Sequence, residues 1–161
     1  MTQNTTKTFV VAGVAMKRLL SGAKTNGQFC LFENRSDGNT RTPVHVHAED
    51  DETIYMIEGE LTAIIDRKMH TLTTGGSIFM PRGVPHQLMN NTDKTARYVL
   101  VGTPSLFDTF VEHAGYEIGA DEKPDASAEA DVARLKAAAP QFGITLLSDW
   151  PTQPEGGSNE A

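Results

Sequence analysis

The feature that most constrains the fold is a run of short apolar segments, separated by turn signals, from about residue 7 to residue 102. The segments are rich in Val, Ile, Phe, Tyr and Thr, which favour strands. Turn-forming pairs such as Glu58-Gly59 and Gly75-Gly76 stand between them. Nine strands are predicted, at 8–12, 28–33, 44–47, 53–58, 61–66, 69–73, 77–80, 86–89 and 96–101. Many short strands with frequent turns predict an all-β sandwich or barrel.

The pattern changes after Thr103-Pro104. Apolar residues between 106 and 114 recur at helical spacing and Gly115 is a plausible stop, so a helix is predicted there. A second helix is predicted at about 128–139, and Pro140 ends it. The last residues are poor in apolar side chains, which predicts disorder. The expected organisation is a barrel at 1–102, a helical extension packed on it at 103–147, and a disordered tail at 148–161.

Composition narrows the function classes. A chain of 161 residues suits one domain with a real core. The net charge of −7, without a basic run, argues against nucleic acid as a partner. The single cysteine, Cys30, cannot form an intrachain disulfide. A polar N-terminus and the lack of a long apolar segment argue against a secretion signal and a membrane span, so we expect a cytoplasmic protein.

Two histidines and a run of acids form the first candidate site. In an extended strand, residues two apart point to the same face, so His45 and His47 provide two imidazoles on one side. Four acids follow at 49–52. If a strand starts near Asp51, Glu52 shares an inward face with Ile54, and it becomes the third candidate ligand. The acids at 49–51 are then expected to be solvated loop residues.

A third histidine completes the set. His86 follows a turn containing Pro81, Gly83 and Pro85, and the strand after that turn would carry it inward. Three imidazoles and one carboxylate suit a divalent transition metal such as Fe, Mn, Ni, Co, Cu or Zn. His70 and His113 match no ligand pattern, and we expect both at the surface.

These residues resemble the two sequence motifs of the cupin superfamily. The first motif matches Gly38, His45, His47, Glu52 and Gly59, and the second matches Gly75, Pro81, Gly83, His86 and Asn90. The one departure is that six residues, instead of five, separate Gly38 from His45. The motifs span about residues 38–90, and the β-rich region extends the resemblance to roughly 8–102. It implies that His45, His47, Glu52 and His86 bind the metal, that Gly59 and Gly75 have positive φ, and that Asn90 closes a turn.

The resemblance also implies a fold and a partner. The expected fold is a double-stranded β-helix, the cupin or jelly-roll barrel, followed by a C-terminal pair of α-helices. Cupins commonly pair through their sheets, so a homodimer is expected. The pocket at the metal is expected to be apolar, with candidates Phe29 or Cys30, Leu31 or Phe32, Ile54, Met56, Ile78, Met80 and Leu88. Arg41 and Arg82 lie beside the site in sequence, and they are either contacts for an anionic substrate group or solvated loop residues.

The expected function follows from the coordination number of the metal. Four protein ligands in an octahedral site would leave two positions for substrate, water or O₂. The segment after the barrel resembles that of single-domain cupins similar to quercetin dioxygenases, in which a helix and a returning segment pack near the barrel mouth. The resemblance implies that Phe107, Phe110 and the helix at 128–139 cover the mouth here. The alternative is that the two helices cover a sheet edge or a dimer surface. The hypothesis is a metal-dependent dioxygenase, an oxidoreductase acting on an enolic or phenolic, apolar or aromatic substrate. Glu52 would be both a metal ligand and the catalytic proton acceptor. Two alternatives stay open: a non-oxidative isomerase, cyclase or lyase, and a small-molecule binding protein without turnover.

Overall fold

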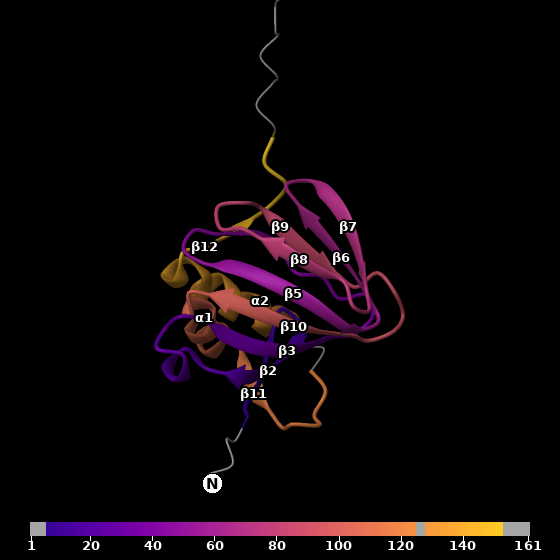
Figure 1. Ribbon diagram of the computed structural model, residues 1–161. Coiled ribbons are helices and arrows are strands. Elements are labelled where there is room, and N and C mark those ends of the chain that lie inside the picture. The colour runs from indigo at the N-terminus through magenta and orange to yellow at the C-terminus, as the bar shows by residue number, and fades with distance from the viewer. Residues whose placement is uncertain (1–5, 125–127, 153–161) are drawn as a thin grey trace, which may run out of the picture.

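Two antiparallel sheets pack face to face in a computed structural model, which describes residues 6–124 and 128–152 (Figure 1). The first sheet has seven strands, in the spatial order β11 (Tyr116–Ile118), β1 (Thr8–Val11), β2 (Val14–Leu20), β3 (Cys30–Ser36), β10 (Ala96–Thr103), β5 (Asp51–Glu58) and β8 (Ser77–Met80). The second has five, in the order β12 (Ile144–Leu147), β4 (Val44–His47), β9 (His86–Met89), β6 (Glu60–Ile65) and β7 (Lys68–Thr73). The predicted all-β jelly-roll class is confirmed.

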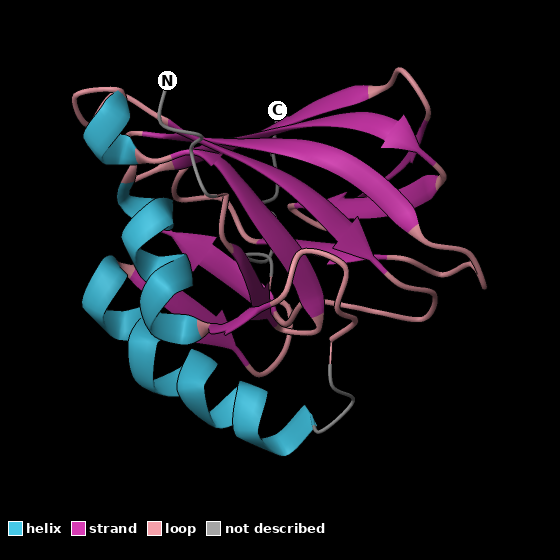
Figure 2. Ribbon diagram, turned by 90° about the horizontal axis from the view of Figure 1, so that it is seen from below, coloured by secondary structure: helices cyan, strands magenta, loops and turns pink. Residues whose placement is uncertain are grey.

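The two predicted helices are also present. They are α1 (Leu106–Ala114) and α2 (Ala128–Ala138), and two short 3-10 helices are η1 (Gly22–Lys24) and η2 (Ala139–Phe142). Gly115 ends α1 as predicted. α2 ends at Ala138, one residue earlier than predicted, and passes directly into η2, which contains Pro140. Figure 2 shows α1 and α2 gathered side by side at one end of the sheets. They cover that end of the barrel.

No helix in the described ranges is both long and apolar enough to cross a membrane.

The strands that carry the site follow a strict alternation. In β3, β5 and β10 every second side chain is buried between the sheets. The period of two is the pattern of a strand with one covered face. Because Glu52 begins the buried set of β5 that continues with Ile54 and Met56, it faces inward, as the sequence predicted.

Tight turns hold the strand connections in place. Gly59 has φ +82, and a Cβ there would lie 2.9 Å from the Thr95 carbonyl oxygen. Gly75 has φ +86. Residues with side chains rarely adopt this conformation. The predicted positive φ at both glycines is confirmed.

Three strands lie outside the predicted set. β2 carries Lys17 and Arg18 in its middle, which hides its apolar alternation. β11 and β12 are short edge strands from the 103–147 segment, pairing with β1 and β4 respectively. That segment therefore extends both sheets as well as contributing the helices. Of the predicted tail at 148–161, residues 153–161 lie outside the described residues, and the backbone carbonyls of Trp150 and Pro151 accept hydrogen bonds from Arg67.

The core divides into two clusters. One lies under the helices and joins β1, β2, β3 and β10 to Phe107, Phe110 and Leu135. The other lies towards the far end of the barrel and contains Ile54 and Met56. The candidate ligands lie between the helices and that far cluster.

Candidate metal centre

Four side chains from three strands converge inside the barrel. His45 and His47 come from β4, His86 from β9 and Glu52 from β5, so both sheets contribute. β4 and β9 are paired directly at His45 and His86. The ligand atoms of the four residues all lie within 4.8 Å of one another. The structure thus brings together all four predicted site residues.

Each imidazole is oriented by a hydrogen bond at Nδ1. His45 Nδ1 lies 2.8 Å from the Pro43 carbonyl oxygen, and His86 Nδ1 lies 3.1 Å from the Val84 carbonyl oxygen. His47 Nδ1 lies 3.1 Å from Oδ2 of Asp50. Carbonyl and carboxylate oxygens only accept, so each Nδ1 carries the proton and donates it. Each neutral ring therefore has its lone pair on Nε2, the form in which histidine binds metals.

The Nε2 atoms of His47 and His86 both lie near the Glu52 carboxylate, and in the neutral rings neither Nε2 carries a proton to donate to it. His86 Nε2 lies 3.1 Å from Glu52 Oε2, and His47 Nε2 lies 3.6 Å from the same oxygen. His47 Nε2 is buried and has no hydrogen-bond partner among the described residues. Lone pairs directed at a carboxylate repel one another unless a cation or proton lies between them. The donor set therefore fits a divalent metal held by three imidazoles and one carboxylate.

Burial and mutual contact shift the ionisation of these groups. Burial, with the His86 and His47 rings, lowers the pKa of His45 to about 3. Burial opposes the charge on Glu52, but the neighbouring His47 and His86 rings outweigh it and lower the Glu52 pKa to about 2. Burial also disfavours charge on His47, whereas the Glu52 and Asp50 carboxylates raise the His47 pKa above its ordinary value. A neutral His45 and an ionised Glu52 are the states that bind metals.

The expectation that Asp50 is a solvated loop residue is wrong. Its side chain is 1% exposed and accepts the hydrogen bond from His47. The adjacent Asp51 behaves differently, because it is partly exposed and forms an ion pair with Arg82 at 3.0 Å. Arg82 is therefore engaged at the surface. Sequence spacing alone did not show which of the acids at 49–51 is buried. The available signal was that Asp50 follows His47 by three residues, a separation at which its carboxylate reaches the ring.

Other predicted roles around the site can also be placed. Asn90 is fully buried, and its amide donates to the Ser36 and Lys94 carbonyls while accepting from Thr92. It closes the turn, as predicted. His70 and His113 are exposed, as expected. Cys30 is buried, and burial raises the pKa of its thiol to about 12, so it provides no thiolate.

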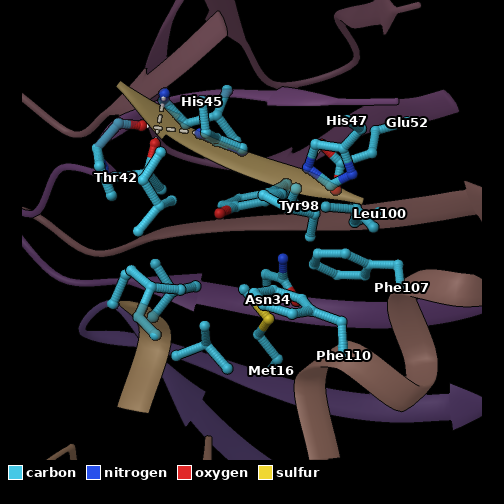
Figure 3. A pocket seen from close by; sticks show the side chains of 18 residues that line it. Met16, Asn34, Thr42, His45, His47, Glu52, Tyr98, Leu100, Phe107 and Phe110 are labelled. Carbon is cyan, nitrogen blue, oxygen red and sulfur yellow. Dashed lines mark hydrogen bonds and ion pairs between the residues drawn. The ribbon is translucent and has the colours of Figure 1, made fainter. Parts of the chain in front are cut away.

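A cavity opens beside the cluster on the side of the helices. His45, His47 and Glu52 form one wall, while Leu100, Phe107 and Phe110 are among its apolar lining (Figure 3). The Phe107 ring lies 5.9 Å from the His47 ring. Most of the lining side chains are apolar, and such a lining suits an organic molecule.

The lining differs from the expected one. Leu88 borders the cavity, but Ile54, Met56, Ile78 and Met80 pack in or against the far core cluster instead. Cys30 and Phe32 belong to the core under the helices. The side chains that replace them come mainly from β1, β2, the helices and β12. The strand pattern shows which side chains face inward, but it does not show at which end of the barrel the space remains.

Comparison with protein families gives a match to the Cupin domain over residues 35–102. This range contains all four converging side chains. It also covers both sequence motifs, from Gly38 to Asn90.

Among curated proteins, the chain is similar to quercetin 2,3-dioxygenase of Bacillus subtilis. The two are 26% identical over 116 residues, covering 65% of this chain and 34% of the relative. The chain thus spans about a third of the length of that relative.

Solved structures give the same architecture. A sugar phosphate isomerase from the cupin superfamily, from Silicibacter pomeroyi, is 30% identical with a TM-score of 0.50, covering 56% of this chain and 59% of the other. A predicted oxalate decarboxylase from Thermotoga maritima has a TM-score of 0.56 at 20% identity, covering 62% and 92% of the two chains. The second likeness concerns the fold alone.

Proposed function

The chain belongs to the cupin superfamily, and on that premise we propose that it is a metal-dependent dioxygenase acting on a neutral enolic or phenolic molecule. One observation carries the proposal: three imidazoles and one carboxylate converge, and three of these four side chains, His45, His47 and Glu52, also line an apolar cavity. The curated relative with quercetin dioxygenase activity supports the reaction class. The proposed metal ligands are His45, His47, Glu52 and His86.

A divalent metal held by His45, His47, Glu52 and His86 would supply Lewis acidity towards a substrate hydroxyl. Glu52 is proposed to accept the proton that the substrate hydroxyl loses. Its pKa of about 2 keeps it ionised at neutral pH, and it lies on the cavity wall within the ligand cluster. A carboxylate so weakly basic accepts a proton only from a hydroxyl that has been strongly acidified. Proton transfer to Glu52 would therefore require a substrate hydroxyl that is already strongly acidified at the site.

The apolar lining would orient the substrate and exclude water. Leu100, Phe107 and Phe110 cover the space next to the histidines, so a flat ring can pack there with its polar edge towards the cluster. α1 carries both phenylalanines, so its position decides how closed the cavity is.

The absence of positive charge in the described cavity lining argues against a sugar phosphate as the substrate. Among the described residues that line the cavity, none is Lys or Arg. A phosphate group would need such a partner to offset its loss of water. The isomerase named among the similar structures therefore supports the fold, but its substrate class fits this cavity poorly.

Oxygen uptake tests the proposal. The purified protein, with its metal content measured by mass spectrometry, is offered flavonols, catechols and enolic diketones in an oxygen electrode. Uptake should require both the metal and one substrate class, and should be lost in Glu52→Gln. Metal-loaded protein without uptake on any of the three classes would contradict the dioxygenase, and turnover assays for isomerase, cyclase and lyase chemistry would then follow.

A further inference from the structure

The cavity contains one polar side chain that the ligand cluster does not use. Asn34 lies on β3, is 0% exposed, and lines the cavity. Neither its amide nitrogen nor its amide oxygen has a hydrogen-bond partner among the described residues. Buried polar groups are nearly always paired, because leaving a carboxamide unpaired is costly. Asn34 therefore offers a donor and an acceptor to the occupant of the cavity.

Asn90 shows what a structural asparagine looks like in the same barrel. It is equally buried, yet its amide donates to Ser36 and Lys94, and its oxygen accepts from Thr92. Asn34 lies in mid-strand, where the backbone ladder of β3 with β2 and β10 needs no help from a side chain. Its amide has no turn or cap to stabilise.

The surroundings of Asn34 are apolar on most sides. It is in register with Met16 on β2 and Tyr98 on β10, and all three line the cavity. Burial raises the pKa of the Tyr98 hydroxyl, and the nearby Asn34 amide opposes this without reaching hydrogen-bond geometry. Figure 3 shows Asn34 between Tyr98 and Phe110, with Tyr98 separating it from His45. Hydrogen bonds formed in such a setting are strong and selective.

We propose that Asn34 is a specificity-determining residue that recognises a hydroxyl group on the part of the ligand remote from the metal. This rests on the proposed function, which places the enolic oxygen of the ligand at the cluster. A hydroxyl can both donate to the amide oxygen and accept from the amide nitrogen. A carboxylate or phosphate can only accept, and the described lining offers no Lys or Arg to balance its charge. The substrate class is therefore a compact, neutral enol or phenol with a second hydroxyl.

Matched pairs of probes test this inference. Kojic acid and allomaltol bind metals through the same hydroxy-ketone, but only kojic acid has a second hydroxyl. In the second pair, 3,4′-dihydroxyflavone and 3-hydroxyflavone share a hydroxy-ketone and differ only in the 4′-hydroxyl. This hydroxyl lies one ring further from the metal-binding group than in kojic acid. Affinities are measured by calorimetry on protein loaded with Zn²⁺, which has no redox chemistry, so the probes are bound and not consumed.

In at least one pair, the hydroxylated probe should bind the wild type about tenfold more tightly than its partner, the effect of one well-placed hydrogen bond to a buried amide. Asn34→Leu should reduce that ratio to about one. Met16→Leu changes the opposite lining residue without changing polarity, and should preserve the ratio even if both affinities shift. If Asn34→Leu is poorly folded, Asn34→Val provides the same apolar replacement.

Thermal unfolding distinguishes recognition from structural support. Asn34→Leu removes no hydrogen bond of the described structure, so its melting temperature should not fall. A large fall, or the same probe ratio in wild type and Asn34→Leu, would overturn the inference. If His86→Ala abolishes binding of all probes but the ratio of probe affinities is the same in wild type and Asn34→Leu, the metal site is supported and the inference about Asn34 fails. A ratio that depends on Asn34 without any oxygen uptake would sustain recognition and refute the dioxygenase.

Discussion

Asp50 Oδ2 accepts a hydrogen bond from His47 Nδ1 at 3.1 Å, and both side chains are almost completely buried. The contact places the His47 proton on Nδ1 and leaves the Nε2 lone pair for the proposed metal. Asp50 does not join the group of converging ligand atoms. It is therefore a positioning residue for His47.

Replacing Asp50 should weaken metal binding without removing a ligand. Asp50→Ala frees the His47 ring to rotate and lowers its basicity. Loss of such a carboxylate–histidine pair typically lowers metal affinity by about 10- to 100-fold. Titration with a competing chelator measures the affinity.

The neighbouring acid is the matched control for this change. Asp51 forms a partly exposed ion pair with Arg82, so Asp51→Ala should leave the metal affinity nearly unchanged. Equal losses in the two variants would mean that the loop as a whole, and not the Asp50 contact, supports the site.

Removing a proposed ligand should empty the site and preserve the fold. In His86→Ala the metal content should fall to a small fraction of the wild-type value, while the far-ultraviolet circular dichroism keeps its β signature, because both core clusters remain packed. His70→Ala, on the exposed face of β7, should retain the metal. Unfolding of His86→Ala would instead identify the metal as structural.

The metal-free protein should lose stability as the pH falls below neutrality. The folded-state pKa of His45, about 3, is below its ordinary value of 6.5, so only the unfolded chain takes up this proton between those values. The free energy of unfolding therefore falls as the pH drops from 6.5 towards 3, by at most about 1.4 kcal/mol per pH unit from this group. Urea titrations from pH 7 to pH 5 measure the slope.

Two other groups define the limits of that window. Glu52, lowered from 4.5 to about 2, contributes stability above pH 4.5 that is lost as the pH falls towards 2. His47, with a raised pKa, contributes stability below pH 6.5 that is lost as the pH rises through its folded-state pKa. Between pH 6.5 and 5 the His45 effect is isolated from Glu52, and His45→Asn should flatten it. An unchanged slope in that variant would rule out His45 as its source.

The position of α1 depends on a buried carboxylate. Asp108 accepts a hydrogen bond from the Gly22 backbone at 2.9 Å and pairs with Arg18 at 2.8 Å. Asp108→Ala leaves these donors without their buried acceptor and should lower the free energy of unfolding by about 1–3 kcal/mol. Chemical denaturation measures the change.

Glu112 provides the comparison, because it pairs with the same Arg18 from a side chain that is 43% exposed. Glu112→Ala should cost less than about 1 kcal/mol. A cost for Glu112→Ala as large as that for Asp108→Ala would show that the charge of Arg18 matters more than burial of its partner.

The convergence of the four candidate ligands could be predicted because it depends on local geometry. A strand places His45 and His47 on one face, and the alternation of β5 selects Glu52 over its neighbours. His86 follows from a turn shaped by nearby Pro and Gly residues. Each of these steps uses residues only a few positions apart, and the motif spacing connects them.

What the sequence did not reveal depends on distant pairing. Nothing near β12 or β11 shows that these short segments add to the edges of β4 and β1. The predicted cavity lining omitted Asn34 for the same reason. The free space is defined only once β3, its neighbouring strands and the helices have come together. Asp50 was missed because burial, not residue type, distinguishes it from Asp51.

The pairing of β12 with β4 sets an order of assembly for the site. Ile144 lies opposite His47 and Leu146 opposite His45, so the strand with two ligands is flanked on one side by residues made far later. During translation, the histidines leave the ribosome well before this flanking strand exists, and domains complete their folding as units. Full occupancy of the proposed metal site would then require that synthesis has passed β12, because a chain interrupted earlier would carry His45 and His47 without the strand that pairs with β4.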